Sequence, residues 1–184
     1  MSRNFNPRRL DVAALSQAKA QVSGHDSVQD YERLSKELHG PAPGVSIDWQ
    51  AVGGQRRAVD GGTYLALHLN ASADLPLTCQ LCMGEIIEPV TVDRHFIFLA
   101  DEEAAASLDE SSEEDDVLAL SSEFDLQALV EDEMLMALPL VPRHEQCPDE
   151  PILASDDADF EAALNDKPKP FASLAALKGS LKSK

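Results

Sequence analysis

The first forty residues carry apolar side chains at the spacing of two short helices. The first predicted helix runs from Leu10 to Val22, ends at Gly24, and presents Val12, Leu15, Ala18 and Val22 on one face. The second is capped by Asp26 or Ser27, is stopped by Gly40-Pro41, and presents Val28, Tyr31, Leu34 and Leu38. Both stripes are typical of faces that pack against a core.

From Gly44 onward the pattern of apolar and polar residues changes to alternation, which predicts half-buried strands. In "VSIDWQAV" the apolar positions are Val45, Ile47 and Trp49, and in "TYLALHLNA" they are Leu65, Leu67 and Leu69. This places His68 on the solvent side. The run "EIIEPVTVDRHFIFLA" predicts one or two further strands, with Pro89 at an edge or a bulge. Gly-rich turns between the runs favour an antiparallel sheet.

Residues 101–123 are dominated by acids, Ser and Ala, and we expect a solvated, disordered insertion in which only "VLAL" could dock. A helix follows, capped by Asp125 and ended by Pro139. Its apolar side comprises Leu126, Leu129, Val130, Met134, Ala137 and Leu138. The acids Glu131, Asp132 and Glu133 point about 100° apart on a helix, so they cannot converge on one ion. We expect them to form a solvated face.

Together these elements predict an α+β fold: a curved antiparallel sheet with N-terminal helices and one helix packed across it. We divide the chain into a helical segment (residues 1–43), a core domain (44–150) that contains the acidic insertion (101–123), and a C-terminal tail (151–184). The tail is acidic and then basic. Its residues Phe171, Leu174 and Leu177 fall on one side of a short helix that either docks on its own domain or binds a partner.

The formal net charge of −18 narrows the choice of partners. No Lys or Arg occurs between Arg94 and Arg143. Such a body repels phosphate backbones and attracts basic proteins, although its charge can also serve solubility alone. No apolar run approaches the length of about 20 residues that a membrane span needs. Three cysteines in 184 residues do not indicate a secreted disulfide scaffold, so we expect a cytoplasmic protein that does not bind membranes.

The pair Cys79 and Cys82 in "LTCQLCMGE" admits three interpretations. Redox catalysis requires a helix after the second cysteine to lower the pKa of its thiol, but a strand-like run follows here. Zinc binding requires a second ligand pair, which His144 and Cys147 offer at the same spacing, with Gly84 permitting the tight turn of the first pair. The remaining interpretation is that the cysteines are structural residues around a turn. A closed site with four ligands would be structural, not catalytic.

Three blocks, "LTCQLCMGEI", "FDLQALVEDEMLMALPLVPRHEQC" and "KPFASLAALK", together resemble the YceD family of large ribosomal RNA subunit accumulation proteins. The resemblance runs from about Val45 to the C-terminus. Its motif falls on Cys79, Cys82, residues 131–133, Leu138-Pro139, His144 and Cys147. It implies a role in the accumulation of large-subunit ribosomal RNA, and it supplies no catalytic mechanism.

We therefore expect a non-catalytic factor of ribosome biogenesis that contacts assembling large-subunit particles, basic ribosomal proteins or precursor rRNA. The residues expected to contact a partner are Leu138, Pro139, Arg143, Phe171, Leu174 and Leu177, and the expected cofactor is a structural zinc ion. One alternative is a binding module that stabilises a soluble protein partner. Another is an RNA-processing enzyme, which would need converging carboxylates or histidines, whereas the five histidines are scattered along the sequence.

Overall fold

The computed structural model describes residues 5–57, 60–109 and 116–148. Its helices and strands lie in one compact unit, Met1–Cys147. The strands are β1 (Gln21–Ser27), β2 (Ser46–Arg57), β3 (Thr63–Thr78), β4 (Glu85–Leu99) and β5 (Asp116–Ala119). The α-helices are α1 (Val12–Ala18), α2 (Glu32–Glu37), α3 (Glu102–Asp109) and α4 (Leu126–Met136), with short 3-10 turns at Pro7–Arg9 and Val28–Asp30. None of the described helices is long and apolar enough to cross a membrane.

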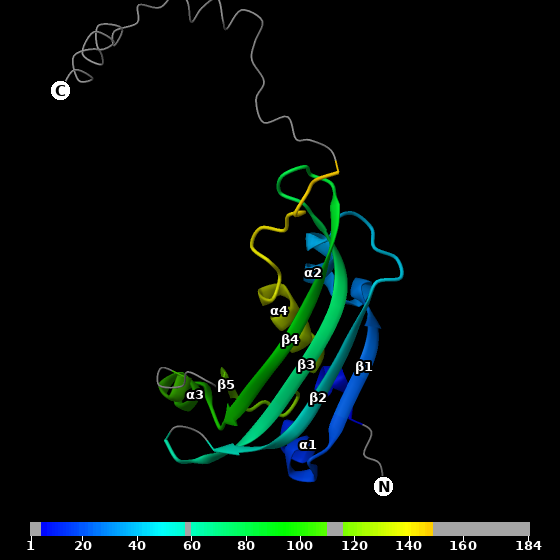
Figure 1. Cartoon of the computed structure of the whole chain (residues 1–184). Coiled ribbons are helices and arrows are strands. Elements are labelled where there is room, and N and C mark those ends of the chain that lie inside the picture. Colours follow the sequence, from blue (N-terminus) through cyan, green and yellow to red (C-terminus); the bar gives the residue numbers. More distant parts are fainter. Residues whose placement is uncertain (1–4, 58–59, 110–115, 149–184) are drawn as a thin grey trace, which may run out of the picture. The chain divides into compact units, whose positions relative to one another are not determined.

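The strands form an open, curved sheet in sequence order, β1-β2-β3-β4-β5 (Figure 1). The first four strands are antiparallel, and β5 pairs parallel to β4. The predicted α+β class is confirmed, but the sheet is mixed instead of purely antiparallel. The reason is that the chain crosses through α3 before it pairs again, so β5 enters in the same direction as β4.

The N-terminal helix is shorter than predicted, because Lys19 takes a left-handed conformation (φ 47°) directly after Ala18. The chain then enters β1, so Val22 and Gly24 lie in a strand and not in a helix. The prediction of a helix ending at Gly24 is therefore wrong. Pairing with β2 explains the difference, since Gly24 lies opposite Trp49 and leaves room for its indole ring. A Cβ atom at Gly24 would lie 2.6 Å from that ring.

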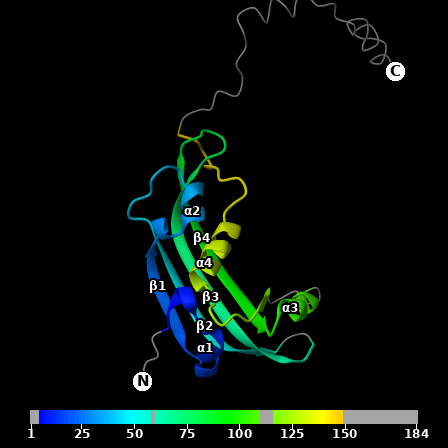
Figure 2. The ribbon, with the colours of Figure 1, turned by 180° about the vertical axis from the view of Figure 1, so that it is seen from behind.

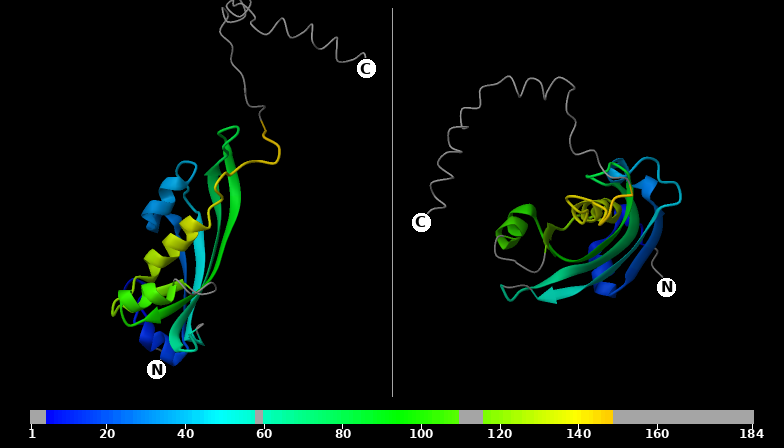
Figure 3. Two further views of the ribbon diagram at one scale, coloured as in Figure 1. Left: turned by 90° about the vertical axis from the view of Figure 1, so that its left-hand side faces the viewer. Right: turned by 45° about the horizontal axis from the view of Figure 1, so that its top comes forward.

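The helices α1, α2 and α4 cover one face of the sheet, as the views from behind and from the side show (Figures 2 and 3). The predicted alternation is confirmed here, because Ile47, Leu67 and Leu69 point into the core while His68 does not. The predicted cap at Asp125 is confirmed as well: its side chain accepts a hydrogen bond from the Ala128 amide at 2.9 Å. The largest fully buried side chains include Tyr31, Leu34, Leu75, Phe96, Ile97 and Met134.

The prediction of a disordered insertion is wrong for its described residues. Helix α3 and strand β5 occupy much of the range 101–123, and residues 110–115 lie outside the described part of the chain. Ala105 and Leu108, three positions apart, are buried against Ala66, Ile97 and Leu99 in a second apolar cluster. A few well-spaced apolar residues are therefore enough to fold this acidic segment onto the end of the sheet.

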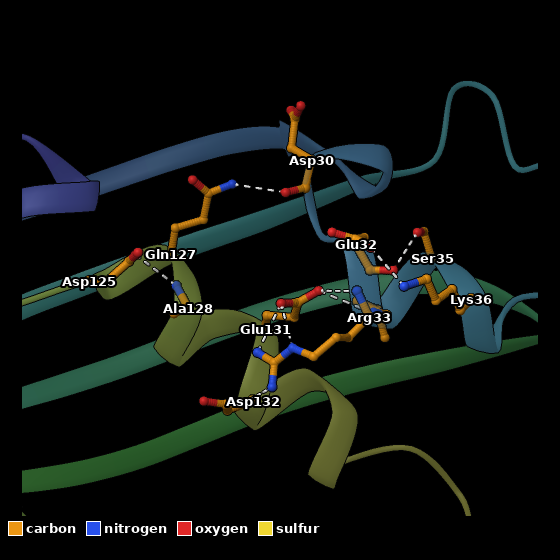
Figure 4. Close-up of polar contacts among 11 residues, drawn as sticks. Asp30, Glu32, Arg33, Ser35, Lys36, Asp125, Gln127, Ala128, Glu131 and Asp132 are labelled. Atoms are coloured by element: carbon orange, nitrogen blue, oxygen red, sulfur yellow. Dashed lines mark hydrogen bonds and ion pairs between the residues drawn. The ribbon is translucent and has the colours of Figure 1, made fainter.

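The expected solvated face of α4 is also partly wrong, because Glu131 and Glu133 are buried. Figure 4 shows the cause for Glu131, whose carboxylate points at the start of α2. It accepts hydrogen bonds from the backbone amides of Arg33 (2.6 Å) and Leu34 (3.2 Å) and pairs with the Arg33 guanidinium. Glu133 lies 3.6 Å from the guanidinium of Arg94. Only Asp132 is exposed, as expected.

Candidate metal-binding site

The loop between β3 and β4 curls tightly around its two cysteines. The amide of Cys79 donates to the carbonyl of Gly84 at 2.8 Å, and the amide of Met83 donates to the carbonyl of Cys79 at 2.9 Å. The left-handed position in this turn is Met83 (φ 61°), not Gly84 as the sequence suggested. The backbone therefore wraps around one point, toward which the Cys79 and Cys82 sulfurs lie close together.

The segment that follows α4 lies beside this loop, at the top of Figure 1. The amide of Gln80 donates to the carbonyl of Pro142 at 2.8 Å, which joins the two segments through their backbones. His144 and Cys147 follow within five residues of Pro142. The structure thus brings together all four predicted ligands from two segments that are distant in sequence.

The four ligand atoms lie within 4.8 Å of one another. The sulfurs of Cys79 and Cys147 are 3.9 Å apart, and the Cys82 sulfur lies 3.5 Å from Nδ1 of His144. Tetrahedral zinc with ordinary bond lengths requires about 3.8 Å between two sulfurs and about 3.6 Å between a sulfur and a nitrogen. These two distances fit a Cys₃His zinc site.

The imidazole of His144 is oriented for metal binding. Its Nε2 lies 3.0 Å from the carbonyl oxygen of Glu85, and only a protonated nitrogen can donate to that acceptor. In the neutral ring, Nδ1 then carries the lone pair, and Nδ1 is the atom that faces the Cys82 sulfur. A backbone carbonyl that fixes the tautomer in this way is the usual outer partner of a metal-binding histidine.

The thiols also show why the site favours a cation. Burial opposes ionisation of Cys79, but amides of Cys82, His144 and Leu81 directed at its sulfur outweigh burial and lower the pKa of Cys79 to about 5. Burial, together with hydrogen bonds and charge from Cys82 and Cys79, raises the pKa of Cys147 to about 11. One thiolate thus forms readily while the neighbouring thiol resists ionisation. A bound divalent ion would remove that opposition by compensating the negative charges.

The surface around the cluster contains exposed apolar side chains that sequence reasoning missed. Leu140 is 99% exposed, Met83 66% and Val141 64%. Leu140 lines a groove of about 320 Å³ whose other walls include Leu38, Leu77, Leu138, Pro139 and Pro142. Single exposed apolar residues are common, but three around one cluster, of which Leu140 lines the groove, mark a candidate contact surface. The signal in the sequence was the run "LPLVP" (residues 138–142), in which Leu140 and Val141 follow the end of the helix.

The residues predicted to contact a partner divide into two groups. Leu138 packs partly against the core, whereas Pro139 and Arg143 are exposed next to the cluster. Phe171, Leu174 and Leu177 lie outside the described residues.

The histidines are less scattered than the sequence suggested. His68 and His95 stack against each other with Asp93 beside them, so two histidines and a carboxylate do converge. The sequence pattern gave no sign of this, because the two histidines belong to different strands.

Comparison with known proteins adds one match. A family model described as "Large ribosomal RNA subunit accumulation protein YceD" matches residues 67–178, which is more than half of the chain. The matched region contains all four residues of the cluster and begins within β3, so it leaves out α1, β1, α2 and β2. No solved structure matches the chain.

Proposed function

The chain belongs to the YceD family, and from that premise we propose that it is a non-catalytic assembly factor that binds basic proteins of the assembling large ribosomal subunit. The family name connects it with accumulation of large-subunit ribosomal RNA. The observation that carries the proposal is the four-ligand cluster, which ties the segment containing Leu140 and Arg143 to the β3–β4 loop.

In this proposal a zinc ion bound by Cys79, Cys82, His144 and Cys147 is structural. When bound, the ion supplies positive charge that compensates the thiolates. With four protein ligands it has no open position for a substrate, so the site does not support hydrolysis. Its effect is to hold the exposed apolar side chains and Arg143 in one fixed arrangement, which lowers the entropy lost when a partner binds.

The net charge of −18 supports a basic partner over naked RNA. Basic ribosomal proteins combine positive charge with apolar anchors, and the groove beside Leu140 combines apolar side chains such as Leu38 and Leu77 with polar ones that include Glu37 and Gln80. Binding to a soluble protein outside the ribosome is the competing function, and the experiment below separates the two.

The test measures the ratio of large-subunit to small-subunit rRNA in a strain that lacks the gene. We expect the ratio to fall, and to be restored by the wild type but not by Cys79→Ser/Cys82→Ser or Leu140→Asp. The matched control is Met136→Asp, because Met136 is also an exposed apolar side chain (67%) but lies beside Arg94 and does not line the groove. An unchanged ratio in the deletion strain contradicts the ribosomal function. Full rescue by Leu140→Asp contradicts the proposed contact surface.

A further inference from the structure

A second group of side chains that could hold a metal ion lies on the face of the sheet opposite α1, α2 and α4. His68 of β3 and His95 of β4 are direct partners in the antiparallel register. Asp93 precedes His95 by two positions, so strand alternation places it on the same face. The neighbours Leu67, Leu69 and Phe96 are buried in the core, which directs this group outward.

The ligand atoms of the three side chains lie close together. Their ligand atoms fall within 4.8 Å of one another. Nε2 of His68 lies 2.6 Å from Oδ1 of Asp93, and the two imidazole rings stack with centroids 4.0 Å apart and planes 7° from parallel. Ligands around tetrahedral zinc are about 3.4 Å apart, and an imidazole binds a metal in the plane of its ring. One of the two parallel rings must therefore turn out of the stack, and the hydrogen-bonded pair must separate, before both histidines bind the same ion.

The backbone that carries these side chains is fixed, since β3 and β4 pair continuously from Leu65–Phe98 to Thr78–Glu85. The side view in Figure 3 shows α1, α2 and α4 on the other side of the sheet, whereas α3 packs on Ala66, Ile97 and Leu99 at one end of the face that carries the group. The side chain of His68 is 36% exposed and that of Asp93 is 72% exposed. Ions and water therefore reach the group directly.

We propose that His68, Asp93 and His95 form a second metal site that takes a divalent transition ion of the zinc type. Two imidazole nitrogens and one carboxylate oxygen suit zinc and its first-row neighbours better than magnesium or calcium, which prefer oxygen ligands. Three protein ligands leave the remaining positions to water, so this site is open where the cysteine cluster is closed. The proposal goes beyond the ribosomal function and does not depend on it.

The same face contains a matched control for this site. Nδ1 of His25 lies 2.7 Å from Oδ1 of Asp48, which reproduces the histidine–carboxylate pair on β1 and β2. The register places Gly24 and His25 opposite Trp49 and Asp48, so no second histidine stands across from this pair. If the second imidazole is what makes a metal site, zinc binds at His68 and not at His25.

The test uses the full chain loaded with one equivalent of zinc, which fills the cysteine cluster, and then titrated with further zinc by calorimetry. We expect the second equivalent to bind, and His95→Asn and Asp93→Asn to weaken its binding tenfold or more. His25→Asn should leave its affinity unchanged. Absence of a second binding event, or equal weakening by His25→Asn, overturns the proposal.

A second measurement on the wild type avoids any doubt about the folding of variants. Imidazole ¹⁵N resonances report which nitrogens bind a metal. The second equivalent of zinc should shift the resonances of His68 and His95 and leave those of His25 and His39 in place. Shifts at His25 equal to those at His68 would reveal adventitious binding to surface histidines and overturn the proposal.

Discussion

Glu131 lies in the middle of α4, yet its carboxylate caps a different helix. Tyr31, the residue before α2, makes no capping hydrogen bond with its own side chain. Glu131 takes that role by accepting from the amides of Arg33 and Leu34, in the first turn of α2. The acidic group thus also lies near the positive end of the helix.

Replacing Glu131 with Ala should therefore destabilise the protein strongly. The change leaves two helix amides without their acceptor and the Arg33 guanidinium without its buried partner. We expect a loss of about 3 kcal/mol in the free energy of unfolding. The control is Asp132→Ala, which removes an exposed carboxylate that lies 2.6 Å from the same guanidinium and should cost less than about 1 kcal/mol. Urea unfolding measures both, and equal losses would contradict the capping role.

Glu133 provides a prediction on pH. Burial raises the pKa of Glu133, although the nearby Arg94 acts to lower it. The folded state thus binds this proton more tightly than the unfolded state does. Glu133 therefore contributes stability at a pH below its pKa in the unfolded state. This contribution is lost as the pH rises through its pKa in the folded state. Glu133→Gln should therefore gain stability relative to the wild type as the pH rises from 4 to 8.

Glu32 serves as a control because its pKa is shifted in the opposite direction. A hydrogen bond from Lys36 lowers the pKa of Glu32, so its contribution is present at neutral pH and is lost as the pH falls through the folded pKa. Glu32→Gln should lose stability relative to the wild type at neutral pH, with no difference in acid. Urea unfolding at a series of pH values measures both variants. Parallel curves for the two would show that the burial of Glu133 is not the cause.

At the scale of elements, helix α1 lies directly on β2 through a glycine. A Cβ atom at Gly53 would lie 2.6 Å from the carbonyl carbon of Leu15 and 2.7 Å from the amide nitrogen of Ser16. These are backbone atoms and cannot rotate away. The helix would have to move to accommodate any side chain at this position.

Gly53→Ala should therefore cost about 1–3 kcal/mol of unfolding free energy, as overpacking does. Its neighbour Gly54 is the control, because a Cβ atom there meets nothing within 4 Å. Gly54→Ala should be neutral or slightly stabilising, since it restricts the unfolded chain. Thermal or urea unfolding compares the two. A neutral Gly53→Ala would mean that α1 does not pack closely on β2.

The elements that the sequence predicted are those with a strong local pattern. Alternation of Leu67 and Leu69 with polar residues identified β3, and Asp125 identified the start of α4. Strand β1 was missed because Val22 is its only large apolar residue and pairing with β2 supplies its stability. The burial of Glu131 was missed because its partner Arg33 lies 98 positions away. The cluster of Cys79, Cys82, His144 and Cys147 was predictable because each pair carries a local spacing of its own.

At the scale of the whole molecule, charge should govern association. With a net charge of −18, binding to basic ribosomal proteins should weaken steadily as salt shortens the range of attraction from about 10 Å at 0.1 M to about 3 Å at 1 M. Capture of large-subunit proteins by the immobilised full chain, at rising salt concentrations, measures this. Leu140→Asp should reduce capture at every salt concentration. Capture that is insensitive to salt, or capture of naked RNA alone, would contradict an electrostatic partnership with basic proteins.

The proposed metal site should hold the β3–β4 loop and the segment after α4 together, but the folding of the core should not depend on it. The ligands join the β3–β4 loop to the segment after α4, while the buried side chains of Leu69, Leu75 and Met134 pack independently of them. Loss of metal should therefore free the segment around Arg143 and leave the sheet folded. No Lys or Arg lies between Arg94 and Arg143, and the next is Lys167, so the fragment that ends at Arg143 identifies cleavage there by its mass. We expect chelation or Cys82→Ser to accelerate cleavage at Arg143 tenfold or more, with little change in far-ultraviolet circular dichroism.

Equal cleavage rates with and without metal would mean that the backbone hydrogen bond between Gln80 and Pro142 suffices to hold the segment. Loss of the dichroism signal would instead show that the ion stabilises the whole fold.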